Sequence, residues 1–230
     1  MDGLTTITFY QFKKNKAWAF AQMGLAPSKI KQNKDLKFFK LMGTGGGNGF
    51  SLWPDFGTYA FLGVWNNQKT ADEFLKHNPI IKSYRLKSET HRTLKMLPLK
   101  SHGLWSGQNP FSPQSLPEKN TSLPVAVITR ATLRPARLLS FWKSVPHASL
   151  AIENARGVRY FKGIGEWPLV QQATLSIWDN IEAVKQFAYH GKIHNQIIKK
   201  TRNENWYSED LFARFQILSD TGFIKSTKAS

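Results

Sequence analysis

Two histidines near the C-terminal end, His190 and His194, are the residues best placed for metal chemistry. They are four positions apart in a segment expected to be helical, so both lie on one face of that helix. Neutral imidazole is a common metal ligand, and one histidine of such a pair can bind a metal while the other orients it or faces solvent. The spacing also suits Zn²⁺, although no third protein ligand is evident nearby. An ordinary polar role for both side chains is the alternative.

The segment that ends at His190 has a near-copy earlier in the chain. TLSIWDNIEAVKQFAYH ends at His190, and FLGVWNNQKTADEFLKH ends at His77. Trp, Phe and His stay in register between the two copies, each pair 113 positions apart. His194 has no such mate, because the matching residue is Ile81. A donor present in only one half is what a single, off-centre metal site requires.

Each half of the chain is predicted to run strand, helix, strand, strand, helix, strand. Apolar residues recur every three or four positions in the helical segments. In the first half the expected elements lie near 4–12, 16–32, 36–43, 58–65, 69–88 and 91–99. In the second half they lie near 124–133, 135–154, 158–164, 171–178, 180–202 and 208–218. This order predicts an α+β protein made of two tandem ferredoxin-like repeats.

Two such sheets in one chain predict a barrel. An antiparallel sheet that helices cover on one face still needs cover on the other. The second copy is therefore expected to pack sheet to sheet on the first, as a fused dimeric α+β barrel with an apolar pocket between the sheets. The expected units are residues 1–105 and 124–230, the second of which holds the metal. A polar, Pro-rich linker, residues 106–123, is expected to join them over the surface.

The composition limits the classes of function. The 230 residues are 41% hydrophobic and can bury a substantial core. No cysteine is present, which excludes disulfides, thiolate nucleophiles and thiolate metal ligands and is compatible with a reducing cytoplasm. We find neither a basic segment followed by an apolar leader at the N-terminus nor an apolar window of about 18 residues. A cytoplasmic protein is the expectation.

The net charge of +17 favours anionic partners. Peripheral contact with the anionic inner face of a membrane is one interpretation, and a solvated basic surface without a specific partner is the other. No nucleic-acid-binding motif is present, so a nucleic-acid partner is disfavoured. The Gly-rich segment GTGGGNG is not a phosphate loop, because no Lys-Ser/Thr follows it. We interpret it as a flap from which Trp53, Pro54 and Phe56 could cover an apolar ligand or enter lipid, with a plain loop as the alternative.

Several blocks of sequence resemble the spheroidene monooxygenase family. They are GTGGGNGF, WSGQNPF, VAVITRATLRPARLLSFWKSVP, GIGEWPLVQQATLSIW and NWYSEDLFARF, and the resemblance covers nearly the whole chain. Two positions depart from the family pattern: Leu104 replaces an expected Arg, and Asn205 replaces an expected Gly. The resemblance implies a haem-containing enzyme that inserts oxygen into an acyclic carotenoid to give a keto group. It also implies a dimeric α+β barrel, here fused in one chain; the electron donor is not identified by the sequence.

The resemblance gives the histidines a specific role. Haem iron needs an axial donor from the protein. His194 is predicted to be the axial ligand and the metal site, and His190 is the alternative. The haem propionates need cationic partners, and the planar fork of arginine suits a carboxylate. Arg130 and Arg134 are predicted to bind them, and ordinary paired or exposed arginines are the alternative.

Three further residues are candidates for a catalytic role. Glu166 follows a glycine turn and is the best carboxylate near the expected pocket, unless it only caps the turn. Gln171, or its neighbour Gln172, could hydrogen-bond bound oxygen or a substrate group, unless it is an ordinary strand-edge amide. Arg214 is expected on a strand where Phe212 shares its side and Leu211, Ala213 and Phe215 face the other way. A buried Arg there would need an anion.

The resemblance leaves other functions open. The same scaffold could run a different haem reaction, such as aldoxime dehydration or peroxide-driven oxidation, because a fold often hosts several chemistries. A non-catalytic haem-binding protein is a third possibility. A basic nucleic-acid binder would show aromatic and basic residues interleaved along a groove, and that pattern is not obvious here.

Overall fold

The computed structural model describes residues 3–47, 53–113, 122–167, 169–190, 201 and 203–225. The first half consists of β1 (Leu4–Gln11), α1 (Lys16–Ile30), β2 (Leu36–Gly45), β3 (Pro54–Trp65), α2 (Gln68–His77), α3 (Pro79–Lys87) and β4 (Thr90–Gly103). The second half consists of β5 (Val125–Leu133), a 3₁₀ turn (Pro135–Arg137), α4 (Leu138–Glu153), β6 (Val158–Trp167), β7 (Gln171–Trp178), α5 (Ile181–His190) and β8 (Tyr207–Gly222). No helix in the described ranges has the length and apolar character that crossing a membrane requires.

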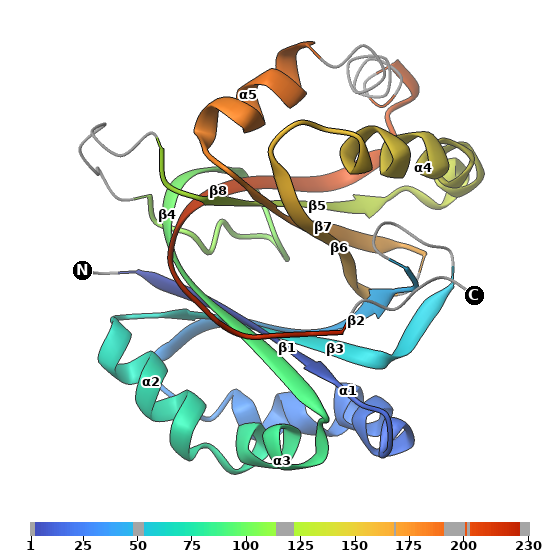
Figure 1. Cartoon of the computed structure of the whole chain (residues 1–230). Coiled ribbons are helices and arrows are strands. Elements are labelled where there is room, and N and C mark those ends of the chain that lie inside the picture. Colours follow the sequence, from blue (N-terminus) through green and yellow to red (C-terminus); the bar gives the residue numbers. More distant parts are fainter. Residues whose placement is uncertain are drawn as a thin grey trace.

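The eight strands form one closed antiparallel barrel in the order β1-β3-β2-β6-β7-β5-β8-β4. Each half keeps the ferredoxin-like order, and the two sheets join at both edges. β4 pairs with β8 along most of its length, whereas β2 meets β6 only at Gly43–Gly165 and Thr44–Ile164. Figure 1 shows α1, α2 and α3 outside the first sheet and α4 and α5 outside the second. The predicted fused dimeric α+β barrel is confirmed.

Much of the space between the two sheets is filled by side chains. Inward-facing residues of both halves, such as Ile7, Ile128 and Phe215, form one buried apolar cluster. Trp105 and Phe111, which follow β4, join this cluster and are almost completely buried. Trp105 packs edge-on against Phe38 with ring centroids 5.6 Å apart. Aromatic side chains from outside the regular strands therefore fill this part of the space between the sheets.

The single helix expected near 69–88 is two helices. α2 ends before Asn78, whose backbone is extended (φ −60°, ψ 127°), and α3 begins at Pro79. Proline has no amide hydrogen, so it suits the first turn of a helix and interrupts a continuous one. The Asn78 side chain accepts hydrogen bonds from the amides of Ile80 and Ile81, which caps the second helix. The apolar periodicity continues across this break, which is why it predicted one helix.

The departure from the family pattern at Asn205 lies in a turn just before β8. Asn205 has a φ of 51°, in the left-handed region that glycine adopts without strain. Asparagine is the side chain that tolerates this conformation best after glycine. The replacement of Gly by Asn is therefore accommodated by the same backbone conformation.

Candidate functional site

Equivalent positions on the helix-facing sides of the two sheets carry different side chains. In the first half Phe61 on β3 pairs with Thr8 on β1, and both are buried; Thr8 is 2% exposed. In the second half the mate of Phe61 is Thr174 on β7, which pairs with Thr129 on β5. Thr129 is exposed although it lies in the middle of a central strand. Thr174 is buried as Phe61 is, but its side chain is much smaller.

The neighbouring strand shows the same asymmetry. Leu41 on β2 pairs with Phe61, whereas its mate on β6, Gly163, pairs with Thr174. In the first half one continuous apolar cluster joins the helices to the sheet. In the described part of the second half this layer is divided into a cluster around Trp178 and another around Trp206. We call the area between them, on the helix-facing side of Gly163, Thr129 and Thr174, the second-sheet face.

Polar and aromatic groups lie on this second-sheet face. The Thr174 hydroxyl is buried and has no hydrogen-bond partner among the described residues. On β8, Leu211, Ala213 and Phe215 belong to the barrel interior, whereas Phe212 packs against the cluster on the helix side. Strand alternation therefore places Arg214 on the helix side as well. His102 on β4 stacks on Phe212, with ring centroids 5.2 Å apart.

Helix α5 packs beside this face and carries one of the two candidate metal ligands. Phe187 of α5 contacts Trp178 at the end of β7 with ring centroids 5.1 Å apart, and Val184 is buried in the same cluster. His190 is the last residue of α5, but its side chain lies outside the described residues, as does all of His194. Within the described ranges, no three His, Asp or Glu side chains are grouped closely enough to hold a metal ion.

The two arginines predicted to bind propionates lie elsewhere. Arg130 is buried on the interior side of β5, pairs with Glu209, and its guanidinium lies 6.0 Å from the centre of the Trp105 ring. Arg134 is exposed and donates a hydrogen bond to the Tyr207 carbonyl (3.1 Å). The structure does not bring either side chain to the second-sheet face. Arg214 is the candidate that lies on that face.

Glu166 holds the segment that fills one end of the barrel. One carboxylate oxygen accepts a hydrogen bond from Trp105 Nε1 (2.6 Å), and the other binds Lys40 Nζ (2.5 Å). Gln171 and Gln172 are half-buried at the start of β7, and strand alternation turns only Gln172 to the helix side. Glu166 and Gln171 are therefore not brought together with Arg214.

Glu209 links three segments of the fold, and sequence reasoning missed it. Its carboxylate accepts hydrogen bonds from the amides of Ser106 (3.0 Å) and Gly107 (2.7 Å) and pairs with Arg130. Burial alone would raise the pKa of this carboxyl, but these hydrogen bonds and the Arg130 charge lower it below its ordinary value. Glu209 lies in the block NWYSEDLFARF, and Ser106 and Gly107 lie in the block WSGQNPF, so both blocks had been singled out. Their spacing along the chain does not show that they are in contact.

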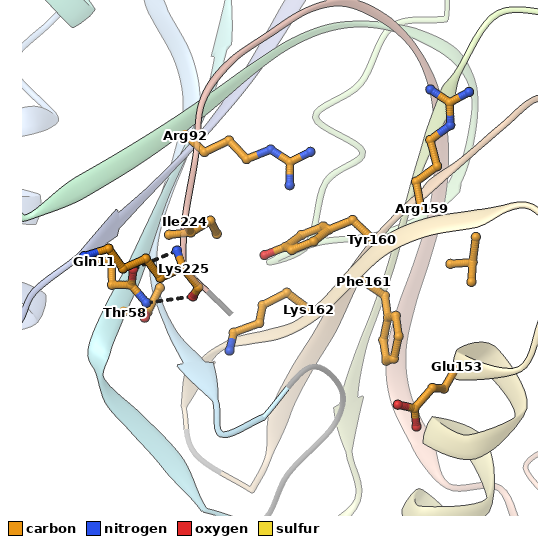
Figure 2. Close-up of a pocket in the computed structure, with 11 residues that line it drawn as sticks. Gln11, Thr58, Arg92, Glu153, Arg159, Tyr160, Phe161, Lys162, Ile224 and Lys225 are labelled. Carbon is orange, nitrogen blue, oxygen red and sulfur yellow. Dashed lines mark hydrogen bonds between the residues drawn. The ribbon is translucent and has the colours of Figure 1, made fainter. Parts of the chain in front are cut away.

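A cavity of about 350 Å³ lies at the other end of the barrel (Figure 2). Arg92, Tyr160 and Lys162 line it, from β4 of the first half and β6 of the second. Arg92 makes a two-pronged ion pair with Asp220 (2.9 and 2.6 Å) and lies 4.6 Å above the Tyr160 ring. Sequence reasoning predicted a pocket between the sheets but none of these lining residues, because they come from both halves.

The polar groups of this cavity are largely satisfied by the protein. Lys162 donates to the Gly47 carbonyl (2.7 Å) and lies 3.8 Å from Asp55. Burial lowers the pKa of the Lys162 amine, and the Asp55 charge acts in the opposite direction. Ile224 and Lys225 of the C-terminal segment line one side of the cavity, where Lys225 and Gln11 exchange two hydrogen bonds (2.9 and 3.0 Å). Figure 2 shows these two bonds beside Ile224.

The fold of this chain is similar to that of the aldoxime dehydratases. A crystal structure of an aldoxime dehydratase with butyraldoxime superimposes with a TM-score of 0.58, covering 94% of this chain and 79% of the other, at 10% sequence identity. A second aldoxime dehydratase structure gives a TM-score of 0.54 over 94% of this chain and 80% of the other, also at 10% identity. At such low identity the similarity concerns the fold alone.

Curated sequences give a closer match. The spheroidene monooxygenase of Rhodobacter capsulatus is 32% identical over 205 residues, which are 89% of this chain and 85% of that protein. The spheroidene monooxygenase of Cereibacter sphaeroides is 33% identical over 220 residues, 95% of this chain and 67% of that protein. No protein-family model matches the chain. The identity and the coverage show that this chain belongs to the spheroidene monooxygenase family.

Proposed function

We propose that this protein is a haem-dependent monooxygenase that inserts oxygen into an acyclic carotenoid or a similarly long apolar molecule. One observation carries the proposal: three relatives named spheroidene monooxygenase are 29–33% identical to this chain over 89–95% of its length. The aligned region covers 89–95% of the chain and therefore spans both halves of the barrel.

The second-sheet face is where the proposal places a large planar cofactor. Gly163 and Thr174 replace the Leu41 and Phe61 that fill the equivalent volume in the first half. The buried Thr174 hydroxyl is available for a hydrogen bond to a bound group. A haem bound there would supply the activation of O₂ and the transfer of one oxygen atom to the substrate.

The chain's own residues would hold and shield that group. His194 is the proposed axial donor, with His190, at the end of α5, as its orienting neighbour or substitute. Arg214 is the proposed partner of a propionate, because its side chain lies on the helix side of β8. Phe212, Trp178 and Phe187 supply apolar walls that would exclude water from the reacting centre.

The proposal is tested by the spectrum of the haem-loaded protein. Wild type should show a Soret band, which His194→Ala should weaken or shift, whereas His190→Ala should have the smaller effect. If wild type shows no Soret band, or if both variants keep the wild-type spectrum, the assignment of the ligand fails. Turnover of an acyclic carotenoid by the loaded protein with O₂ and a chemical electron donor then tests the reaction. Turnover of a short aldoxime but not of the carotenoid would favour the other haem chemistry.

A further inference from the structure

Four large apolar side chains are exposed on α1 and near the start of β3. Phe20 (59% exposed) and Leu25 lie on α1, Trp53 (80% exposed) immediately precedes β3, and Phe56 lies near the beginning of that strand. The rings of Phe20 and Phe56 contact each other edge to face, with centroids 5.9 Å apart. We call these four residues the Phe20 surface. Singly exposed apolar residues are ordinary, but a contiguous aromatic group on the surface marks a binding site.

Helix α1 presents a complete apolar stripe to solvent. Its buried side is formed by residues such as Ala19, Ala26 and Ile30. The opposite side is exposed and carries small residues between Phe20 and Leu25, namely Ala17, Ala21, Gly24 and Ser28. At 100° per residue these positions fall within one face of the helix. The helix is therefore apolar on both sides, although only one side contacts the sheet.

Cationic side chains border this stripe. Lys16 and Lys29 are exposed at the two edges of the apolar face, and Lys13 and Lys14 precede the helix. From Gly3 to Lys34 the chain contains six lysines and no acidic residue. The neighbouring carboxylate, Asp55, accepts a hydrogen bond from the Gly57 amide (2.8 Å) and lies beside Lys162, so it is turned toward the protein. The electrostatic field over the Phe20 surface is therefore positive.

This combination matches the interface of an anionic bilayer. An apolar helix face bordered by lysines can insert its aromatic residues at the level of the headgroups while the lysine ammonium groups remain in water. Trp is the side chain that favours this boundary region most. Each lysine near an anionic surface adds roughly 1 kcal/mol of attraction. The phosphates of a nucleic acid would pair with the lysines, but they would leave the apolar residues of this stripe exposed to water.

We propose that the Phe20 surface docks the protein on the surface of an anionic lipid bilayer. The docking is independent of the proposed haem chemistry, because every residue that carries it lies in the first half. It deepens the proposed function in one respect: it would bring the protein to the phase in which a long apolar substrate dissolves.

Vesicle flotation tests this docking. Purified protein is mixed with vesicles of phosphatidylcholine alone or with about a third phosphatidylglycerol, an anionic lipid. Wild type should float with the anionic vesicles. When only neutral vesicles are present, it should remain at the bottom of the gradient. Phe20→Ser and Trp53→Ser should each lower the partition coefficient about tenfold, as expected when one large apolar side chain no longer contacts lipid. Both residues are exposed, so the thermal melting of the variants should match wild type.

Leu139→Ser is the matched control, because Leu139 is 80% exposed on α4, the helix of the other half. It should float like wild type. Equal losses for Leu139→Ser and Phe20→Ser, or flotation of Phe20→Ser at the wild-type level, would overturn the proposal. Retention on heparin should be the same for wild type and Phe20→Ser; a parallel loss there would indicate a polyanion partner instead of lipid. A Soret band is read independently in each variant, so a failure of docking is distinguishable from a failure to bind haem.

Discussion

Thr174 lies in the second sheet where Phe61 lies in the first, and this pair gives the two halves opposite properties on their helix-facing sides. Phe61 stacks on Phe74 with ring centroids 5.9 Å apart and completes a closed layer. Thr174 buries an unpartnered hydroxyl, within the described part of the chain, next to the exposed Thr129. Within the described residues, Leu41 and Phe61 of the first half thus have the small counterparts Gly163 and Thr174 in the second.

Introducing a large side chain at position 174 should fill the second-sheet face. Thr174→Phe places in the second half the residue that the first half already accommodates, so the barrel should still fold. Haem titration followed by the Soret band should show at least about tenfold weaker binding, because a ring would occupy the volume available to the cofactor. Thr174→Ser keeps a small hydroxyl side chain and serves as the control. Unchanged haem affinity in Thr174→Phe would show that the cofactor binds elsewhere.

Removing the charge of Glu209 should destabilise the protein in a pH-dependent way. Glu209→Gln leaves Arg130 buried without its counter-charge and should lower the free energy of unfolding at pH 7 by about 1–3 kcal/mol. The pKa of Glu209 is lowered in the folded state, so its stabilisation is complete above the ordinary value of 4.5 and is lost as the pH falls through the folded pKa.

Urea unfolding at pH 7 and at successively lower pH measures this dependence. The difference between wild type and Glu209→Gln should shrink as the pH falls below 4.5. Asp210→Asn changes the neighbouring exposed carboxylate and should leave stability nearly unchanged at pH 7. A difference between wild type and Glu209→Gln that stays constant with pH would contradict the role of the carboxylate charge.

Trp105 should be a major source of stability although it lies outside the regular strands. Its side chain is fully buried, and Trp105→Ala should lower the free energy of unfolding by about 3–5 kcal/mol, because the barrel end would lose its filling. Chemical denaturation measures the loss. Trp53→Ala removes an exposed tryptophan and should cost under about 0.5 kcal/mol. Similar losses for both variants would show that Trp105 does not fill the barrel end.

Asn78 should stabilise the break between α2 and α3. Its side chain accepts two amide hydrogen bonds at the start of α3, so Asn78→Ala should lower the free energy of unfolding by about 1 kcal/mol. Thermal melting would register this as a drop of a few degrees. Lys82→Ala, an exposed change within the same helix, should have little effect. Equal melting temperatures for the two variants would show that the Asn78 cap contributes nothing to stability.

The order of the strands and helices could be predicted from the sequence, because each element carries its own periodicity. The repeat of Trp65 and Trp178 in register also predicted two like halves, since both tryptophans end an equivalent strand. The helix break at Asn78 was not predicted, because the apolar pattern continues across it. The roles of Glu166 and Arg130 could not be predicted either, because each depends on Trp105, which is distant from both along the chain.

The sequence by itself determined the two ferredoxin-like halves, the positive charge and the family. Only the tertiary structure decided how the halves close into a barrel, which aromatic residues fill it, and that Gly163 and Thr174 take the places of Leu41 and Phe61 on one helix-facing side. Periodicity reports on contacts within a strand or helix, where neighbours are close in the chain. Whether a volume is filled depends on side chains that converge from several strands. The pattern of residues along the chain does not give the distances between those side chains.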